Sequence, residues 1–130
     1  MIIGIGIDLV DIARIETMLR RNDGQAARKL LTVDEAAFAS TLRMDRREAE
    51  WVAGRFAAKE AFMKAMGIGL SGQISMQDIE ILPDRSGKPV VKLSQAVQQM
   101  FAHTILCHIS ITHTASTAGA VIIIEKEGGK

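Results

Sequence analysis

The stretch GIGIDLVDI, residues 4–12, constrains the fold more than any other part of this sequence. Successive side chains of a β-strand point to opposite faces of its sheet. One face of this strand carries three isoleucines, Ile3, Ile5 and Ile7. The opposite face carries two glycines and a carboxylate, Gly4, Gly6 and Asp8. We expect the isoleucine face to be buried in the core, and the space left by the glycines to be filled by a group that favours a nearby negative charge.

The length and composition fit one compact domain over residues 1–130, of which 48% are hydrophobic. The net charge of +1 does not suggest a general nucleic-acid binder, because such domains are usually strongly basic. No run of eighteen apolar residues is long enough for a membrane span, and the N-terminal stretch lacks the basic region of a signal peptide. The single cysteine, Cys107, permits no disulfide within one chain, which favours a reducing compartment. We therefore expect a cytoplasmic protein without a nucleic-acid or membrane partner.

Periodicity and turn residues predict the order of the elements. We expect strands over residues 2–8, 74–82, 89–93, 107–113 and 118–125. We expect helices from Asp11 to the turn at 22–24, then over 32–41, 46–66 and 94–103. The second helix should open with a capping box at Thr32 and Glu35, and the third should end at Gly67. This order predicts an α+β fold with helices packed on a mostly antiparallel sheet.

Asp8 is the first residue that could take part in chemistry. Its position before a helix also suits an ordinary helix cap, and position alone favours that interpretation. A dinucleotide-binding turn fits poorly, because Leu9 stands where the third glycine should be and no parallel βαβ unit follows.

The long helix, with the sequence GRFAAKEAFMKAM, is the second candidate. Glu60 and Lys64 are neighbours four residues apart, as are Arg55 and Lys59, and all four could simply be charges of an exposed helix face. The small residues around them would let another backbone or a ligand approach closely. These residues are Gly54, Ala57, Ala58, Ala61 and Ala65.

The strand HISITHT, residues 108–114, is the third candidate, because His108, Ser110 and Thr112 share one face. Such a stripe is most often solvated, although histidines and hydroxyls also bind phosphate, and His113 could lie beside one. The spacing of the single cysteine and the three histidines does not match that of zinc ligands. A carboxylate pair with lysine and arginine nearby favours Mg²⁺ and a phosphate substrate instead.

Three segments together resemble the holo-[acyl-carrier-protein] synthases, the short 4′-phosphopantetheinyl transferases. They are GIGIDLVDIARI (4–15), FAAKEAFMKA (56–65) and HISITHT (108–114). The resemblance implies transfer of 4′-phosphopantetheine from coenzyme A to a serine of apo acyl carrier protein in fatty acid biosynthesis, releasing adenosine 3′,5′-bisphosphate. It also implies a homotrimer with active sites between adjacent subunits.

The resemblance further implies roles for individual residues. Asp8 and Glu60 would hold Mg²⁺, which Mn²⁺ could replace, on the pyrophosphate of coenzyme A. Lys64 would contact the phosphates. Because a metal ion lowers the pKa of a bound water, we also expect Glu60 to act as base through such a water. The remaining contacts to coenzyme A would come from Arg46, Arg47, Arg55, Gly67, Gly69, Lys88, Pro89 and His113.

A basic stripe with a thioether, formed by Arg14, Met18 and Arg21 at helical spacing, would dock the acidic carrier protein, with Arg28 adding to it. An ordinary solvated helix face is the alternative for this stripe. Two other functions also stay open at this point. They are a non-catalytic trimer that binds coenzyme A or carrier protein, and a Mg²⁺-dependent nucleotide enzyme such as a pyrophosphate hydrolase.

Overall fold

The computed structural model describes residues 1–42, 46–67 and 74–128. The N-terminal half contains β1 (Ile2–Asp11), α1 (Ile12–Arg20), the 3₁₀ turn η1 (Arg21–Gly24), α2 (Gln25–Arg28), α3 (Val33–Ala39) and α4 (Arg47–Met66). The C-terminal half contains the 3₁₀ turn η2 (Met76–Asp78), β2 (Ile79–Pro83), β3 (Pro89–Leu93), α5 (Gln95–Gln98), β4 (Ile105–His113) and β5 (Thr117–Lys126). The predicted α+β class is confirmed.

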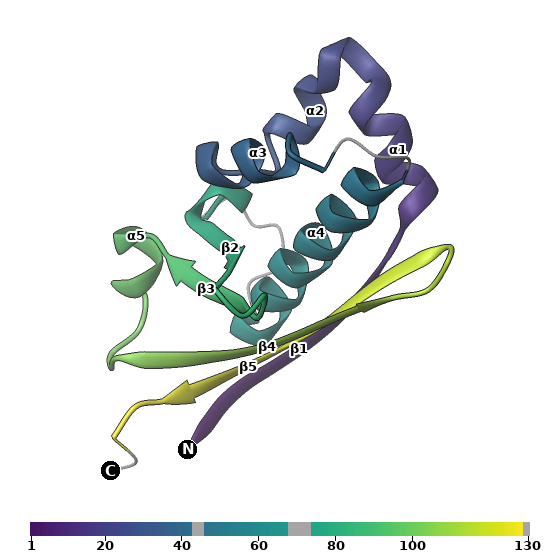
Figure 1. Ribbon diagram of the computed structural model, residues 1–130. Coiled ribbons are helices and arrows are strands. Elements are labelled where there is room, and N and C mark those ends of the chain that lie inside the picture. The colour runs from purple at the N-terminus through teal and green to yellow at the C-terminus, as the bar shows by residue number, and fades with distance from the viewer. Residues whose placement is uncertain (43–45, 68–73, 129–130) are drawn as a thin grey trace.

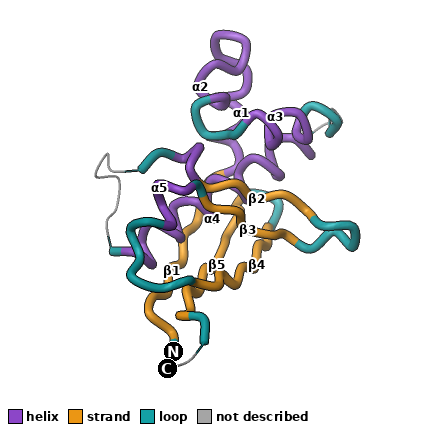
Figure 2. The backbone as a smooth tube through the Cα atoms, turned by 90° about the vertical axis from the view of Figure 1, so that its left-hand side faces the viewer, coloured by secondary structure: helices purple, strands orange, loops and turns teal. Residues whose placement is uncertain are grey.

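Two antiparallel sheets frame the molecule. A three-stranded sheet has the order β1-β5-β4, and β2 and β3 form a separate hairpin. Figure 1 shows α4 lying across one face of the three-stranded sheet, with α1, α2 and α3 beyond it and the hairpin beside it. Figure 2 shows the three strands side by side beneath this helical layer. Helix α4 therefore lies at the centre of the fold. In the described part of the chain, no helix is long and apolar enough to cross a bilayer.

The glycines of β1 are filled by the backbone of α4. A Cβ atom added at Gly6 would collide with the carbonyl oxygen of Ala61, and one added at Gly4 would collide with that of Ala65. Of the two alternatives for the small residues on this helix, close approach of another backbone is therefore correct. Because this contact draws strand and helix together, it also brings Asp8 to the charged end of α4.

The prediction that the isoleucine face of β1 lies in the core is wrong for the single chain. Ile5 and Ile7 are 66% and 65% exposed, and Leu9 on the same face is 70% exposed. Gly6 and Val10 on the opposite face are buried. The alternation was read correctly, but the glycine face is the one that packs on α4.

The sequence predicted the start of α3 and the end of α4 correctly. Thr32 and Glu35 form the predicted capping box of α3, and Gly67 ends α4 in the left-handed region with a φ of 77°. Ser94 caps α5, but this helix stops at Gln98 rather than near residue 103, because Val97 is its only buried residue. Residues 74–82 do not form one strand, since Ser75 caps the η2 turn before β2 begins.

Three charged residues of the described part of the chain lie in the interior. Glu35, Arg55 and Lys59 are all buried, with relative exposures of 0%, 8% and 0%. The interpretation of Arg55 and Lys59 as charges of an exposed helix face is therefore wrong. Helix α4 is covered by the sheet on one side and by other elements on the opposite side, so most of its circumference is interior.

Candidate active site

Asp8 and Lys64 meet where β1 crosses the C-terminal half of α4. Lys64 Nζ donates to Asp8 Oδ1 at 2.8 Å and to the carbonyl oxygen of Ile7 at 3.2 Å. The hydrogen bond to the carboxylate, followed by its negative charge, raises the pKa of Lys64. The helix-cap interpretation of Asp8 is wrong, because Asp11 occupies the cap position of α1 and Asp8 pairs with Lys64.

Glu60 lies one helical turn before Lys64 and is partly buried. Burial raises the pKa of Glu60, the nearby charge of Asp8 raises it further, and Lys64 and Arg14 act in the opposite direction. The carboxylate is therefore a stronger base than an ordinary glutamate. Asp8 and Glu60 form an acidic pair that would gain from an additional positive charge.

The donor set of this pair suits a hard cation that keeps several of its own ligands. Two carboxylates, with no histidine or sulfur among them, match the preference of Mg²⁺ for one or two protein carboxylates plus substrate phosphates. Among the described residues there is no group of three or more His, Cys, Asp or Glu side chains that could form a closed metal cage. The residues present therefore fit a cation shared with a phosphate ligand.

A cavity of about 710 Å³ lies beside the N-terminal half of α4, between the turn of the β2–β3 hairpin and the end of β4. Several of the predicted coenzyme A contacts line it together, although they come from distant parts of the sequence. These are Arg47, Arg55, Lys88, Pro89 and His113. Other lining residues are Phe38, Glu50, Trp51, Asp84 and Ser110.

Arg55 provides the most rigid positive charge of this cavity. Its guanidinium lies 4.0 Å from the centre of the Trp51 ring, and its Nε donates to the carbonyl oxygen of Ile81 at 3.1 Å. Phe38 stacks on the same indole with ring centroids 5.0 Å apart. Burial lowers the pKa of Arg55 to about 10, so the side chain is still protonated at neutral pH. Such a fixed guanidinium suits a phosphate group.

Lys88 and His113 line this cavity from two different elements, the β2–β3 turn and the end of β4. Asp84 orders the turn that carries Lys88, because its Oδ1 accepts from the backbone nitrogens of Ser86 and Lys88 at 2.8 and 3.0 Å. His113 Nδ1 lies 3.2 Å from the carbonyl oxygen of Thr114 and 3.9 Å from Glu50 Oε2. Both side chains remain exposed.

Three other predicted contacts lie apart from this cavity or outside the described residues. Arg46, at the start of α4, pairs with Glu16 Oε1 at 2.8 Å and donates to the carbonyl oxygen of Ala115 at 2.7 Å. It is not among the residues that line the cavity. Gly67 caps the opposite end of α4, and Gly69 lies outside the described residues.

The predicted docking residues do not form one helical stripe. Arg14 is exposed on α1, and its guanidinium lies 5.7 Å from the centre of the Phe56 ring. Met18, four residues later, is half-buried against the core rather than exposed. Arg21 follows the end of α1 in η1, and Arg28 is exposed on α2. Arg14 also interacts with Glu60, so it links this surface to the acidic pair.

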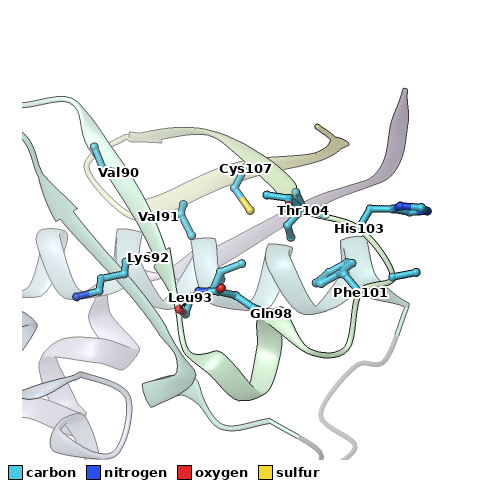
Figure 3. A pocket seen from close by; sticks show the side chains of 11 residues that line it. Val90, Val91, Lys92, Leu93, Gln98, Phe101, His103, Thr104 and Cys107 are labelled. Carbon is cyan, nitrogen blue, oxygen red and sulfur yellow. Dashed lines mark hydrogen bonds between the residues drawn. The ribbon is translucent and has the colours of Figure 1, made fainter. Parts of the chain in front are cut away.

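A second cavity of about 750 Å³ is lined by residues of β3 and β4 and of the segment between them. Figure 3 shows Val90 and Lys92 at one end of it, Phe101 and His103 at the other, and Val91 and Cys107 between them. Burial raises the pKa of the Cys107 thiol to about 11, so this thiol is protonated and unreactive at neutral pH.

Helix α4 separates the acidic pair from the first cavity. Lys64 follows Arg55 by nine residues, which places it about 180° around the helix axis at about 100° per residue. The strands agree, because Asp8 belongs to β1 and His113 to β4, the two outer strands of the sheet. One chain therefore carries two half-sites that face away from each other.

Sequence reasoning missed Trp51, Asp84 and Glu35. Trp51 could have been found from the sequence, because it precedes Arg55 by four residues on the same helix and side chains at that spacing are neighbours. Asp84 opens a turn with Gly87, which is a recognisable turn signature. Glu35 was identified only as a cap, and its second role depends on tertiary contacts that its spacing does not reveal.

Comparison with known proteins assigns the chain to a family. The sequence model of the 4′-phosphopantetheinyl transferase superfamily matches residues 4–122. The chain belongs to this superfamily. Among the members similar to it, the holo-[acyl-carrier-protein] synthase of Bacillus velezensis is 47% identical over 126 residues, covering 97% of this chain and 98% of that protein. The synthase of Bacillus subtilis is 44% identical over 129 residues, with coverage of 97% and 98%.

Solved structures of the superfamily share the fold. A synthase from Bacillus anthracis, in complex with CoA (3′,5′-ADP), superposes with a TM-score of 0.83 at 38% identity, covering 98% of this chain and 99% of that one. The Helicobacter pylori synthase in complex with coenzyme A gives a TM-score of 0.81 at 31% identity, with coverage of 93% and 99%. The predicted family, transferase class and fold are therefore confirmed.

Proposed function

We propose that this phosphopantetheinyl transferase acts as a Mg²⁺-dependent holo-[acyl-carrier-protein] synthase in fatty acid biosynthesis. It takes 4′-phosphopantetheine from coenzyme A, attaches it to a serine of apo acyl carrier protein and releases adenosine 3′,5′-bisphosphate. The observation that carries the proposal is the cluster of Asp8, Glu60 and Lys64 at the contact between β1 and α4. This cluster lies in a chain that resembles such synthases over nearly its whole length.

Asp8 and Glu60 are the residues that would hold Mg²⁺. When bound, this cation supplies positive charge that stabilises the oxygens of a pyrophosphate during transfer. Lys64 contributes a second positive charge next to the same oxygens, as its contact with Asp8 places its ammonium at the acidic pair. The raised pKa of Glu60 suits acceptance of the proton from the attacking serine hydroxyl.

The cavity lined by Arg47, Arg55, Lys88, Pro89 and His113 would bind the nucleotide end of coenzyme A. Arg55 offers a charge fixed by Trp51 and Ile81, which suits the 3′-phosphate. Lys88 and His113 add exposed groups from the β2–β3 turn and the end of β4. The cavity volume of about 710 Å³ is that of a typical site for a small molecule.

We further propose that the protein is a homotrimer whose active sites form between subunits. The half-sites of one chain lie on opposite sides of α4, so a complete site needs the acidic pair of one copy and the cavity of another. The outer face of the sheet supports such an assembly. Ile5, Ile7 and Leu9 lie on one face of β1 and are all exposed, and a contiguous apolar patch of this kind marks a protein–protein contact. A closed ring of identical contacts would cover this face in every copy.

Arg14, Arg21 and Arg28 are the residues proposed to attract the acidic carrier protein, with Met18 contributing a smaller apolar contact than expected. Arg14 is the most informative of them, because it is exposed and also close enough to influence Glu60. A carrier protein docked on Arg14 would present its serine near the acidic pair. Charge complementarity of this kind mainly raises the association rate and selects the partner.

Intact mass spectrometry of apo acyl carrier protein tests the function directly. The carrier is incubated with this protein, coenzyme A and Mg²⁺, and a parallel sample contains EDTA. We expect a mass gain of one phosphopantetheine group that disappears with EDTA. No gain with several carrier proteins would favour a binding module, and cleavage of coenzyme A without any transfer would favour a pyrophosphate hydrolase.

A further inference from the structure

Glu35 makes more contacts than a helix cap requires. Its Oε1 accepts from the Thr32 backbone nitrogen at 2.9 Å and from Lys59 Nζ at 2.5 Å, while its Oε2 accepts from the Ile81 backbone nitrogen at 2.7 Å. The side chains of Glu35 and Lys59 are both fully buried. One carboxylate on α3 therefore joins the central helix α4 to strand β2.

Lys59 completes this buried cluster by donating also to the carbonyl oxygen of Leu30 at 2.7 Å. Among the described residues, no buried side-chain nitrogen or oxygen lacks a hydrogen-bond partner. The ion pair is thus satisfied by the surrounding protein, and neither of its residues is among those that line the first cavity. It belongs to the framework rather than to the reacting groups.

The peptide groups of Ile81 lie at the centre of this framework. Ile81 is paired with Val91 of β3, yet its N–H donates to Glu35 and its C=O accepts from Arg55 Nε. These groups therefore point away from β3, along the free edge of the hairpin. Glu35 and Arg55 satisfy that edge with side chains, where a third strand would otherwise pair.

The attachment matters because a two-stranded hairpin is marginally stable on its own. The β2–β3 turn carries Lys88 and Pro89 to one wall of the first cavity, and α4 carries Arg55 to another. Thr32 adds a further tie, since its hydroxyl donates to Glu80 of β2 at 2.7 Å. The distance between the walls depends on how firmly the free edge of β2 is held against α3 and α4.

We propose that Glu35 is a positioning residue of the coenzyme A site, which holds the β2–β3 hairpin against α4 by binding Lys59 and the Ile81 amide together. This inference rests on the proposed role of the first cavity in binding the nucleotide end of coenzyme A. Loss of the Ile81 contact should loosen Lys88 and Pro89 and raise the KM for coenzyme A. The KM for the carrier protein should not change, because α1 and α2 are not attached through Ile81.

Two double variants separate positioning from a merely structural contribution. Removing one charge alone would leave the other buried without its partner and could prevent folding. Glu35→Leu with Lys59→Met removes both charges and also the acceptor for the Ile81 amide. Glu35→Gln with Lys59→Met removes both charges but retains an amide oxygen as acceptor. Both proteins are to be compared at a temperature where circular dichroism shows them fully folded.

We expect the Leu/Met variant to raise the KM for coenzyme A roughly five- to tenfold, the scale of one lost hydrogen bond. We expect the Gln/Met variant to stay within about twofold of the natural protein, since its amide still accepts from Ile81. The proposal would be overturned if the two double variants had the same KM for coenzyme A, whether that value equals or exceeds the KM of the natural protein. The proposal would also be overturned if the Leu/Met variant raised the KM for the carrier protein as much as the KM for coenzyme A.

Lys88→Ala serves as the control for the proposed function. If Lys88→Ala leaves the KM for coenzyme A unchanged, the cavity is not the nucleotide site and the proposed function of that cavity fails. If Lys88→Ala raises this KM while the two doubles agree with each other, only the role of Glu35 fails. Amide hydrogen exchange of the natural protein adds a measurement that needs no variant. The Ile81 amide should be protected despite its place on a strand edge, and rapid exchange would overturn the proposal.

Discussion

Two lysines of α4, each paired with a carboxylate from another element, show how burial separates a structural ion pair from a candidate site. Lys59 and Glu35 are 2.5 Å apart with both side chains fully buried. Lys64 and Asp8 are 2.8 Å apart, and their side chains are 54% and 16% exposed. Each pair joins a lysine to a carboxylate, a glutamate in the first and an aspartate in the second, and the lysines are five positions apart, yet the burial of the two pairs differs.

The difference lies in what each pair still needs. The buried pair is fully hydrogen-bonded by the turn after α2, by α3 and by β2, so both of its charges are balanced inside the protein. The exposed pair has Glu60 beside it, whose pKa is raised by burial and by Asp8. Two carboxylates with only part of their negative charge balanced favour an incoming cation. A contact between a lysine and a carboxylate is therefore not enough to identify a site. A solvent-exposed group whose charge is not fully balanced is the better indication.

The largest effect should follow from removing one of the two exposed carboxylates. Glu60→Gln and Asp8→Asn should each lower the transfer rate roughly 10³-fold, because the site loses a charge needed for the cation and the phosphates. The rate is measured by mass spectrometry of the carrier protein, with circular dichroism to show an intact fold. Glu48→Gln on the same helix is the matched control and should keep the natural rate. Retention of most activity in Glu60→Gln would contradict its role.

The next largest effect should appear in the stability of the buried pair. Lys59→Met leaves the Glu35 carboxylate buried without its cation, which typically costs about 3–5 kcal/mol of unfolding free energy. Lys64→Met, the matched change in the exposed pair, should leave the unfolding free energy nearly unchanged because solvent screens that contact. Urea denaturation of both variants measures the comparison. Similar losses in the two variants would show that burial does not distinguish the pairs.

A smaller effect is expected at the carrier-protein surface. Arg14→Glu should weaken binding of apo carrier protein about tenfold, because it reverses a charge that attracts an acidic partner. Binding of coenzyme A, measured by calorimetry, should change far less. Lys126→Glu at the end of β5 provides a charge-matched control with little effect on either ligand. Equal losses for carrier protein and coenzyme A in Arg14→Glu would contradict the docking role.

The smallest effect concerns the stability of the metal-free protein. The folded-state pKa of Glu60 is raised, so its ionised form is disfavoured in the folded protein. This penalty is present at neutral pH and disappears as the pH falls through the folded and then the unfolded pKa. Glu60→Gln should therefore raise the melting temperature at pH 7.5 by roughly 1–3 °C, with a difference that shrinks towards pH 4. A destabilised variant at pH 7.5 would contradict the raised pKa.

Local chemistry explains which parts of the fold were predictable. The capping box at Thr32, the end of α4 at Gly67 and the β2–β3 turn are specified by residues within a few positions of one another. The packing direction of β1 was not predictable in this way. Alternation separates the isoleucines from the glycines, but only the close approach of α4 decides which face is covered within one chain.

The sequence predicted which residues of the proposed site lie close together, but it did not predict the buried residues that hold the surrounding elements in place. Asp8, Glu60 and Lys64 were expected together from their motifs, and the structure brings them together. Glu35 and Lys59 were not recognised as a buried pair, because they are 24 residues apart and only tertiary packing joins them. Arg21 was expected on the same helical face as Arg14, but α1 ends at Arg20.

The central claim is that α4 divides the site into two halves that only a second copy can bring together. Mixed trimers of two inactive proteins test this most directly. One carries Glu60→Gln, and the other carries Lys88→Glu with His113→Ala, so each damages a different half-site. The two are refolded together in equal amounts and assayed by mass spectrometry at a coenzyme A concentration below the natural KM.

If active sites form between subunits as proposed, each site in such mixtures takes the acidic pair from one subunit and the cavity from its neighbour. Random assembly then gives an intact site in about one case in four, so we expect roughly a quarter of the natural activity to return. Each variant refolded alone is the control and should stay inactive. Activity in the mixture no higher than the sum of the two controls would show that each site lies within a single chain.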